Sequence, residues 1–309
     1  MKQTMKRITA VLVAVCLCML SVVSVFAQQD GPDVKAEAYC VINRKDGSIV
    51  YSKNMDDRYY PASITKIMTA LVTLEHCTDL DDTVVFNSEV MDSISSNSST
   101  LNPVAILDEE MTVRDALFGL MLNSANECAS ALAVYTAGSI DAFVEMMNEK
   151  AQELGAVNTH YMNAHGLDDD DHYTTAYDMA KITQYALKNK KFVEVFDRYQ
   201  YTSSDGQHQW VKKVIYKSKR DHIDTSMNEG CKSGYTSKAQ STLSSLLNIN
   251  DHHYVCVVGF SKNSDGYNHC TVNDTLALGN YVKDHYSVAN IIKKDTKMNS
   301  VKIKNGQTN

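Results

Sequence analysis

The sequence predicts a mixed α/β fold of the α+β type, in which an antiparallel sheet is flanked by helices and an all-helical lobe is inserted at about residues 88–190. Three observations support this prediction. Strand-like alternation surrounds a turn near the N-terminus, helical periodicity fills the middle of the chain, and strand-like patterns return after Arg198. A length of 309 residues suits one or two domains, and the patterns favour one mixed domain over residues 28–285.

Residues 1–27 are typical of an export signal. Lys2, Lys6 and Arg7 precede an uncharged run, and the segment ends in the small residue Ala27. We therefore expect cleavage after Ala27 and a location in the cell envelope, either extracellular or membrane-associated. The apolar run approaches the roughly 20 residues that span a bilayer, so an uncleaved anchor is the alternative.

Residues 286–309 form a polar, lysine-rich tail. One short alternating piece, Ser300–Lys304, could be the first strand of a truncated β-domain. We expect no membrane-binding amphipathic helix in this tail.

The charge and the cysteines exclude several classes of function. Without the signal, the chain carries 27 Lys and Arg against 37 Asp and Glu, a formal charge of −10 for residues 28–309. Such an acidic chain is not expected to bind nucleic acid. The six cysteines of this region form no Cys-x-x-Cys pair and the histidines are scattered, so we expect free buried thiols and neither a metal nor another cofactor. The sequence does not predict an oligomeric state.

The first elements after the leader are two strands and a helix. Ala36–Arg44 and Ser48–Lys53 alternate apolar and polar residues around Asp46-Gly47, which predicts a hairpin. The next helix begins after Pro61 and runs to about His76, because its apolar residues recur at helical spacing.

Helical patterns and polar loops fill the middle of the chain. The loop Asp92–Thr100 is rich in serine and asparagine and should lie on the surface. The four aspartates Asp168–Asp171 favour a solvated loop over a cation site, because calcium loops alternate their ligands and use a distal glutamate. The expected helices follow a capping box at Thr112, resume after Asn126 up to Gly138, run from Ser139 to Leu154, and run from Thr175 to about Asn189.

Strand patterns then return. We expect strands at Trp210–Tyr216 and Cys231–Thr236, and a hairpin formed by Ser241–Ile249 and His253–Phe260. Thr271–Val282 is expected to be a closing helix.

The stretch around Ser63 and Lys66 places a hydroxyl and an amine three residues apart. Residues at i and i+3 share a helix face, so the two groups can meet as nucleophile and base. A serine that caps a helix beside a solvated lysine is the commoner explanation of such a pair when it stands alone. Further motifs must therefore decide.

Two further motifs follow in order: Ser124-Ala125-Asn126 and Lys232-Ser233-Gly234. With Ser63-x-x-Lys66 and flanking segments such as Met68-Thr69-Ala70 and His165-Gly166-Leu167, the chain resembles the serine D-alanyl-D-alanine carboxypeptidases over about residues 36–285. These are the low-molecular-mass penicillin-binding proteins. The resemblance implies a β-lactamase/transpeptidase-like fold.

The chemistry of the first motif can be argued directly. The Ser63 hydroxyl is a weak nucleophile, so a neighbouring base must take its proton, and the Lys66 amine can do so only when it is neutral. Burial and a second positive charge from Lys232 would both lower the pKa of Lys66.

The resemblance implies roles for the second motif. Ser124 would relay a proton toward the leaving amine, and Asn126 would contact the substrate amide or the lysine. A helix cap and a turn residue are the structural alternatives for this pair.

The third motif is expected on a strand that faces the substrate. Lys232 and Ser233 could hold a substrate carboxylate, and Gly234 leaves room for substrate against the strand edge. By resemblance, the backbone N–H groups of Ser63 and Tyr235 would form the oxyanion hole.

The chain departs from the family pattern near the substrate carboxylate. Ser233 replaces the usual threonine and Gln240 replaces a common glycine. The segment Lys217–Met227 lacks the expected asparagine- and leucine-rich approach, and no arginine lies between Ser261 and Asp284, where some members bind the terminal carboxylate. These departures concern substrate binding rather than the nucleophile.

The resemblance implies an exported serine D,D-carboxypeptidase. It would remove the terminal D-alanine from peptidoglycan stem peptides that end in D-Ala-D-Ala, through an acyl-enzyme at Ser63, and β-lactam antibiotics would inhibit it. One alternative is a catalytically silent penicillin- or peptidoglycan-binding protein on the same scaffold. The other is a serine β-lactamase, but the Glu-x-x-x-Asn pattern of class A members is missing between Asn158 and Thr175.

Overall fold

The structure is a computed structural model that describes residues 31–95, 98–262 and 269–288. The predicted export signal, the strand expected at Ser300–Lys304 and the tail beyond residue 288 lie outside these residues. The chain divides into two units, residues 1–33 and 34–309, and the second holds every element described below.

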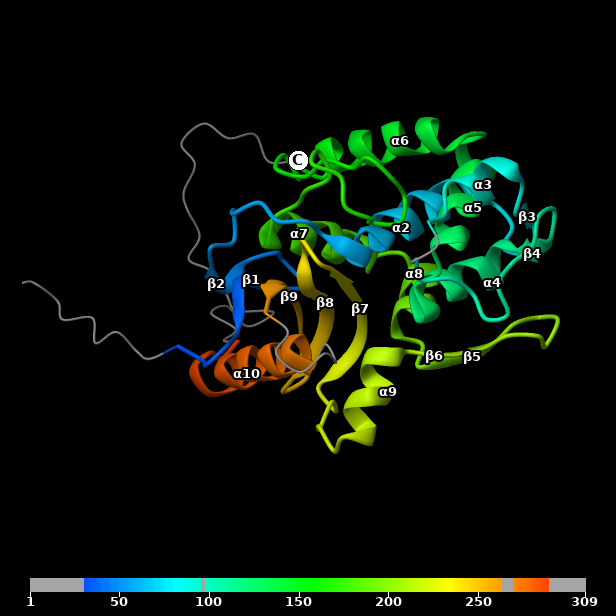
Figure 1. The fold of residues 1–309 in the computed structure, drawn as a ribbon. Helices are drawn as coiled ribbons and strands as arrows, with labels where there is room; N and C mark the ends of the chain where they lie inside the picture. Colours follow the sequence, from blue (N-terminus) through cyan, green and yellow to red (C-terminus); the bar gives the residue numbers. More distant parts are fainter. Residues whose placement is uncertain (1–30, 96–97, 263–268, 289–309) are drawn as a thin grey trace, which may run out of the picture. The chain divides into compact units, whose positions relative to one another are not determined.

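A five-stranded antiparallel sheet forms the centre of this unit, in the order β2-β1-β9-β8-β7 (Figure 1). Both expected hairpins are present. Gly47 (φ +74°) lies in the first turn, and Asn250 (φ 52°) and Asp251 (φ 63°) form the second, with the paired positive φ values that suit the twist of a hairpin. The strands are β1 (Ala36–Asn43), β2 (Ile49–Lys53), β7 (Asn228–Thr236), β8 (Gln240–Ile249) and β9 (His252–Ser261). The mixed α/β prediction is confirmed, and β7 lies at one edge of the sheet.

The lobe that precedes these last strands is mainly helical, but it is not all-helical as predicted. Strand β4 (Glu110–Thr112) lies within it and pairs with β3 (Thr83–Val85); three residues are too few to produce a clear alternating pattern. The helices are α3 (Ser88–Asp92), α4 (Val113–Phe118), the π-helix η2 (Gly119–Asn123), α5 (Asn126–Ala137), α6 (Ile140–Glu153) and α7 (Ala176–Ala186), and the unpredicted α8 (Lys190–Asp197) follows them.

Successive side chains of the sheet enter two different cores. On β1, Ile42 joins the core on the lobe side, whereas Val41 joins the core on the opposite face. Helix α10 (His269–His285) is the expected closing helix and packs on that opposite face, while α7 packs on the lobe side (Figure 1).

The motif serine lies one turn before the helix expected to carry it. Ala62–Thr65 form the short 3₁₀ helix η1, and α2 (Lys66–His76) begins at Lys66. Helix α2 contacts α5, α6 and α7, so all of Lys66–Leu74 is buried. A helix that is enclosed on every side buries even its lysine.

The prediction of a strand over Trp210–Tyr216 is wrong for the second half of this segment. Gln209–Val211 form β6, which pairs with β5 (Gln200–Thr202), but the chain then turns into α9 (Lys213–Arg220). The β-branched and aromatic residues favoured a strand, whereas burial of Val214, Ile215 and Ser218 follows helical spacing. This helix lies near the open edge of β7.

The polar loops and the cysteines lie as expected. Three of the four aspartates at 168–171 are exposed, and Asp168 accepts a hydrogen bond of 2.6 Å from Thr236 at the end of β7. The six cysteines of the described residues are free and buried.

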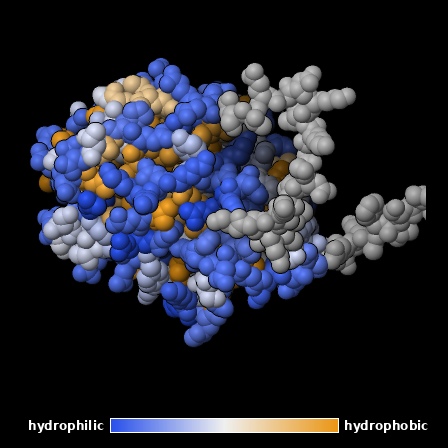
Figure 2. Space-filling view, turned by 180° about the vertical axis from the view of Figure 1, so that it is seen from behind, coloured by the Kyte–Doolittle hydropathy of each residue, from blue (hydrophilic) through white to orange (hydrophobic). Residues whose placement is uncertain are grey.

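The face in Figure 2 is largely hydrophilic, with apolar residues gathered in patches. Among residues 31–95, 98–262 and 269–288, no helix has the length and apolarity needed to cross a bilayer.

Candidate active site

The structure brings Ser63 and Lys66 together across the junction of η1 and α2. Lys66 Nζ lies 3.0 Å from Ser63 Oγ, which is hydrogen-bond distance. Ser63 is half-buried, whereas Lys66 is fully buried. The hydroxyl is thus reachable from outside, with the amine behind it.

The surroundings of Lys66 suit a neutral amine. Its Nζ donates to Asn126 Oδ1 and to the backbone oxygen of His165, both at 2.7 Å. A neutral amine has two N–H donors and one lone pair, so these two bonds leave the lone pair for the Ser63 hydroxyl. Burial, and next the positive charge of Lys232, hold the pKa of Lys66 well below its usual range.

Lys232 on β7 lies beside the second motif. Its Nζ donates to Ser124 Oγ at 3.0 Å and to the backbone oxygen of Ser233 at 2.7 Å. Lys232 is buried, and burial lowers its pKa to about 7, with Lys212 and Lys213 adding to the effect. The three motifs therefore meet in space through two lysines.

An irregular turn presents Ser124. The π-helix η2 ends at this residue, which adopts a left-handed conformation with φ 62°. For a residue other than glycine this conformation is uncommon and costs energy, as is often found at functional sites. The next residues enter α5, and Asn126 N–H donates to the oxygen of Ser99 at 2.8 Å. The serine-rich surface loop thereby holds the second motif in place.

Gly234 allows β7 to approach the nucleophile. A Cβ atom at this position would lie only 2.6 Å from the backbone nitrogen of Ser63. The neighbouring Ser233 is half-buried and Tyr235 is 53% exposed. Because β7 is an edge strand, its outer side is open beside Ser63.

The segment 158–175 supplies contacts that sequence reasoning did not identify. The carbonyl group that accepts from Lys66 belongs to His165, and no sequence signal marks a backbone acceptor. Thr65 Oγ1 lies 2.9 Å from Nε2 of His172, whose pKa burial lowers to about 3, so that ring is neutral. A side chain at Gly166 would overlap the oxygen of Ala62, which explains the glycine beside the motif turn.

A cavity of about 330 Å³ opens over this site. Its lining includes Ser63, Ser124, Ser233, Gly234 and Tyr235, so residues of all three motifs face one space. Six residues that the sequence analysis did not assign to the site also line it: Ser99, Asn123, Lys213, Val214, Lys217 and His269.

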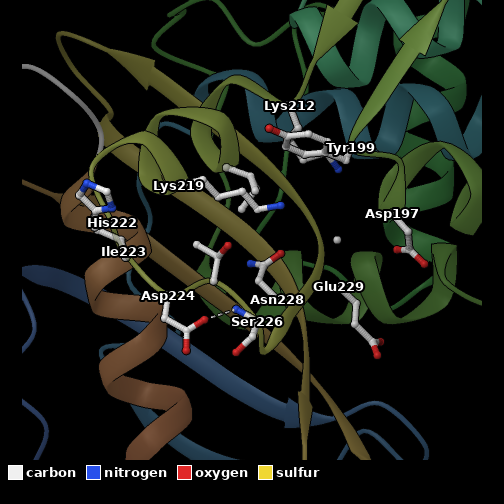
Figure 3. Close-up of a pocket in the computed structure, with 13 residues that line it drawn as sticks. Asp197, Tyr199, Lys212, Lys219, His222, Ile223, Asp224, Ser226, Asn228 and Glu229 are labelled. Atoms are coloured by element: carbon white, nitrogen blue, oxygen red, sulfur yellow. Dashed lines mark hydrogen bonds between the residues drawn. The ribbon is translucent and has the colours of Figure 1, made fainter.

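A larger cavity of about 590 Å³ lies elsewhere, between α9 and the first residues of β7 (Figure 3). Figure 3 shows Asp197 and Glu229 on one side of it and Lys219 across from them. None of its lining residues belongs to the three motifs. We therefore take the smaller cavity as the candidate active site, because the motif residues line it, although its volume is smaller.

Ser63 on η1, which packs against β7 and β8 of the antiparallel sheet, lies beside the buried Lys66, and this arrangement is typical of serine peptidases of the penicillin-binding fold. Comparison with known proteins agrees. The family model described as D-alanyl-D-alanine carboxypeptidase matches residues 24–263, and the chain belongs to this family of serine peptidases.

Named relatives and solved structures support the same family. The D-alanyl-D-alanine carboxypeptidase DacF of Bacillus subtilis is 30% identical over 98% of this chain and 77% of its own length. DacA of Escherichia coli K12 is 32% identical over 67% of this chain, which spans only 52% of that relative. The crystal structure of the Streptomyces K15 DD-transpeptidase superposes with a TM-score of 0.71 at 27% identity, covering 81% of this chain and 98% of that one.

Proposed function

We propose that this protein is an exported serine D,D-carboxypeptidase that releases the terminal D-alanine from peptidoglycan stem peptides ending in D-Ala-D-Ala. One observation carries the proposal: the buried Lys66 amine lies 3.0 Å from Ser63 Oγ while its two other hydrogen bonds go to carbonyl oxygens. This arrangement supports a neutral base beside a nucleophile. DacF and the other named relatives are D-alanyl-D-alanine carboxypeptidases, which agrees with this substrate.

Acylation begins with the proton of Ser63. Lys66 Nζ takes it as Oγ attacks the carbonyl carbon of the penultimate D-alanine. The backbone N–H groups of Ser63 and Tyr235 stabilise the resulting oxyanion, and losing one such donor typically costs about 3 kcal/mol of transition-state stabilisation. The open edge of β7 and the missing Cβ at Gly234 give the substrate carbonyl access to this position.

The leaving group needs a proton. When the C–N bond breaks, the amine of the departing D-alanine takes a proton from Ser124 Oγ. The proton that Lys66 accepted from Ser63 passes back to Ser124, with Lys232 stabilising the Ser124 oxygen, so Lys66 is neutral again. The hydrogen bond of 3.0 Å between Lys232 Nζ and Ser124 Oγ supports this relay. Water then attacks the ester carbonyl as Lys66 takes one of its protons, the ester C–O bond breaks, and Lys66 gives that proton to Ser63 Oγ.

The export signal predicted at residues 1–27 supports a site of action outside the cytoplasm, and we expect cleavage after Ala27. N-terminal sequencing of the protein recovered from the cell envelope tests this part. A first residue of Gln28 supports it, and an intact Met1 would instead favour an uncleaved anchor.

Two measurements test the activity. We expect D-alanine release from a pentapeptide ending in D-Ala-D-Ala, and a mass increase equal to one penicillin on the intact protein. Both should vanish in Ser63→Ala and persist in Ser237→Ala, a matched change at an exposed turn serine. A penicillin adduct without D-alanine release would favour the catalytically silent binding protein, and rapid penicillin turnover would favour a β-lactamase.

A further inference from the structure

Two hydrogen bonds join the second motif to the loop that precedes it. Asn126 N–H donates to the oxygen of Ser99 at 2.8 Å, and Asn123 Nδ2 donates to the oxygen of Thr100 at 2.6 Å. The two donors flank Ser124, whose left-handed backbone conformation needs support from its surroundings. The loop and the turn that presents Ser124 therefore form one unit.

A third bond of this unit uses a buried acid. Glu127 lies in the first turn of α5 and is only 1% exposed. Its Oε1 accepts the N–H of Leu101 at 2.6 Å, whereas its Oε2 is buried and has no hydrogen-bond partner among the described residues. Burying a carboxyl group with one unbonded oxygen is costly, so Glu127 points to a role beyond packing.

The charge of Glu127 acts on the base. Glu127 follows Asn126, whose side chain accepts from Lys66 Nζ. Burial, and next the charge of Lys232, lower the pKa of Lys66, whereas the negative charge of Glu127 raises it. Burial raises the pKa of Glu127 itself, but the hydrogen bond from Leu101 N–H acts against this, so we expect the carboxylate to be ionised at neutral pH.

Three other ionisable groups near Lys66 are neutral. Burial lowers the pKa of His165 and that of His172 to about 3, so neither ring is charged. Burial raises the pKa of the Cys128 thiol well above its usual value. The charges that act on this amine therefore belong to the acid on α5 and the lysine on β7.

Three charged groups on the other helices packed against α5 have partners of their own. They are Asp115 on α4 with Tyr201, Glu89 on α3 with the Ile140 N–H, and Lys150 on α6 with Glu75 and Glu153.

We infer that Glu127 is a positioning residue of the active site, which holds the turn that presents Ser124 and places a negative charge near the base Lys66. This inference rests on the proposed function and adds a residue outside the three motifs to it. The two effects are separable, because the bond to Leu101 needs only an acceptor oxygen, whereas the effect on Lys66 needs a charge.

The first test measures the rate of acylation against pH in Glu127→Gln. The amide keeps an acceptor for Leu101 N–H but removes the charge, so the pKa of Lys66 should fall. Because acylation needs neutral Lys66, the acidic limb of the profile should move by about one pH unit toward lower pH, opposite to the shift expected for Lys232→Met. A residue that acts only through packing would lower the rate without moving the limb.

The second test compares two substrates in Glu127→Ala, which also loses the bond to Leu101. A departing amine needs the proton of Ser124, so kcat for D-alanine release from the pentapeptide should fall about 10- to 100-fold. A thioester of the same acyl group has a thiolate leaving group that needs no proton, and its kcat should fall less than about threefold.

Two variants serve as controls. Glu149→Gln removes an exposed acid of α6 and should change neither the pH profile nor kcat for either substrate. Glu127→Gln should restore most of the D-alanine release that Glu127→Ala loses, because it keeps the acceptor. Should Glu127→Ala not fold, the pH profile of Glu127→Gln decides.

The possible results are distinct. An acidic limb that stays in place in Glu127→Gln, or equal losses on both substrates in Glu127→Ala, would overturn the role of Glu127 while leaving the peptidase intact. A wild type that releases no D-alanine would overturn the proposed function, and with it this inference.

Discussion

Lys66 and Lys212 are both buried lysines, with exposed fractions of 0% and 4%, but they lie beside different cavities. Burial lowers the pKa of each. Lys66 stands behind the Ser63 cavity and contacts a hydroxyl, whereas Lys212 lines the larger cavity of Figure 3 and donates to the backbone oxygen of Phe196.

The comparison of the two lysines shows that burial alone does not make an amine a general base. A lowered pKa makes an amine able to accept a proton, but catalysis also requires a proton donor within hydrogen-bond distance and a path for substrate. Lys66 meets these conditions through Ser63 and the open edge of β7. Lys212 instead donates to the backbone carbonyl of Phe196, which has no proton to give. The carboxyl of Asp197, which lines the same cavity, has a pKa that burial raises to about 6. Volume and burial alone would have selected the larger cavity, whose lining contains no residue of the three motifs.

Ser63→Ala should cause the largest loss of activity among the variants at the two cavities. Removing the nucleophile should reduce D-alanine release by about 10⁴-fold or more and abolish the penicillin adduct. Steady-state kinetics and intact-mass spectrometry measure these losses. An unchanged adduct would move the nucleophile to another residue.

Lys66→Met should cause the second largest loss of activity. Without its base, Ser63 keeps its proton, so we expect a loss of about 10²- to 10⁴-fold in the rate of acylation. Stopped-flow measurement with a chromogenic cephalosporin gives this rate. Lys212→Met is the matched control at the other buried lysine, and an equal loss there would remove the distinction between the two.

The pH dependence tests how Lys232 acts on Lys66. Acylation needs neutral Lys66, so its rate should fall as pH decreases through the lowered pKa of that amine. Replacing Lys232 by methionine removes a nearby positive charge, raises the pKa of Lys66, and should move the acidic limb of the profile by about one pH unit toward higher pH. A limb that stays in place would show that burial alone sets the pKa.

The smallest effect on activity is expected for Lys212→Met. We expect kcat/KM to change by less than about threefold, because Lys212 lies at the other cavity, and the free energy of unfolding to fall by about 1–3 kcal/mol, because the Phe196 carbonyl loses its donor. Urea denaturation with parallel kinetics measures both quantities. A large loss of activity at unchanged stability would show that the second cavity contributes to catalysis.

The sequence predicted the elements whose signals are local. The Asp46-Gly47 hairpin and the helix start at Thr112 depend on a few adjacent residues, and both are present in the structure. Thr112 accepts the N–H of Asp115 as predicted, whereas the Asp115 carboxylate accepts from Tyr201 and Ser204. Spacing likewise indicated that Ser63 and Lys66 could meet. The order of the three motifs indicated that distant residues share one site, although no spacing rule gives the distance between Lys232 and Ser124.

Other features depend on tertiary context. The strand expected at Trp210–Tyr216 would have placed Lys213 and Lys217 about 13 Å apart, whereas helix α9 brings residues at this spacing within one turn. Because of this error in secondary structure, the sequence did not predict that both lysines line the cavity over Ser63. The sequence could not predict the contact of Lys66 with the His165 carbonyl, because every residue has a backbone oxygen. Only the fold determines which of these oxygens faces Lys66.

The protonation state of Lys66 tests the central claim most directly. Nuclear magnetic resonance of protein labelled with ¹³C and ¹⁵N in lysine side chains reports whether each amine is charged, and Lys66→Arg identifies the resonance. We predict a neutral amine at Lys66 at pH 7, well below the usual lysine pKa of about 10.4. A charged ammonium at Lys66 that persists above pH 9 would contradict its role as the base for Ser63.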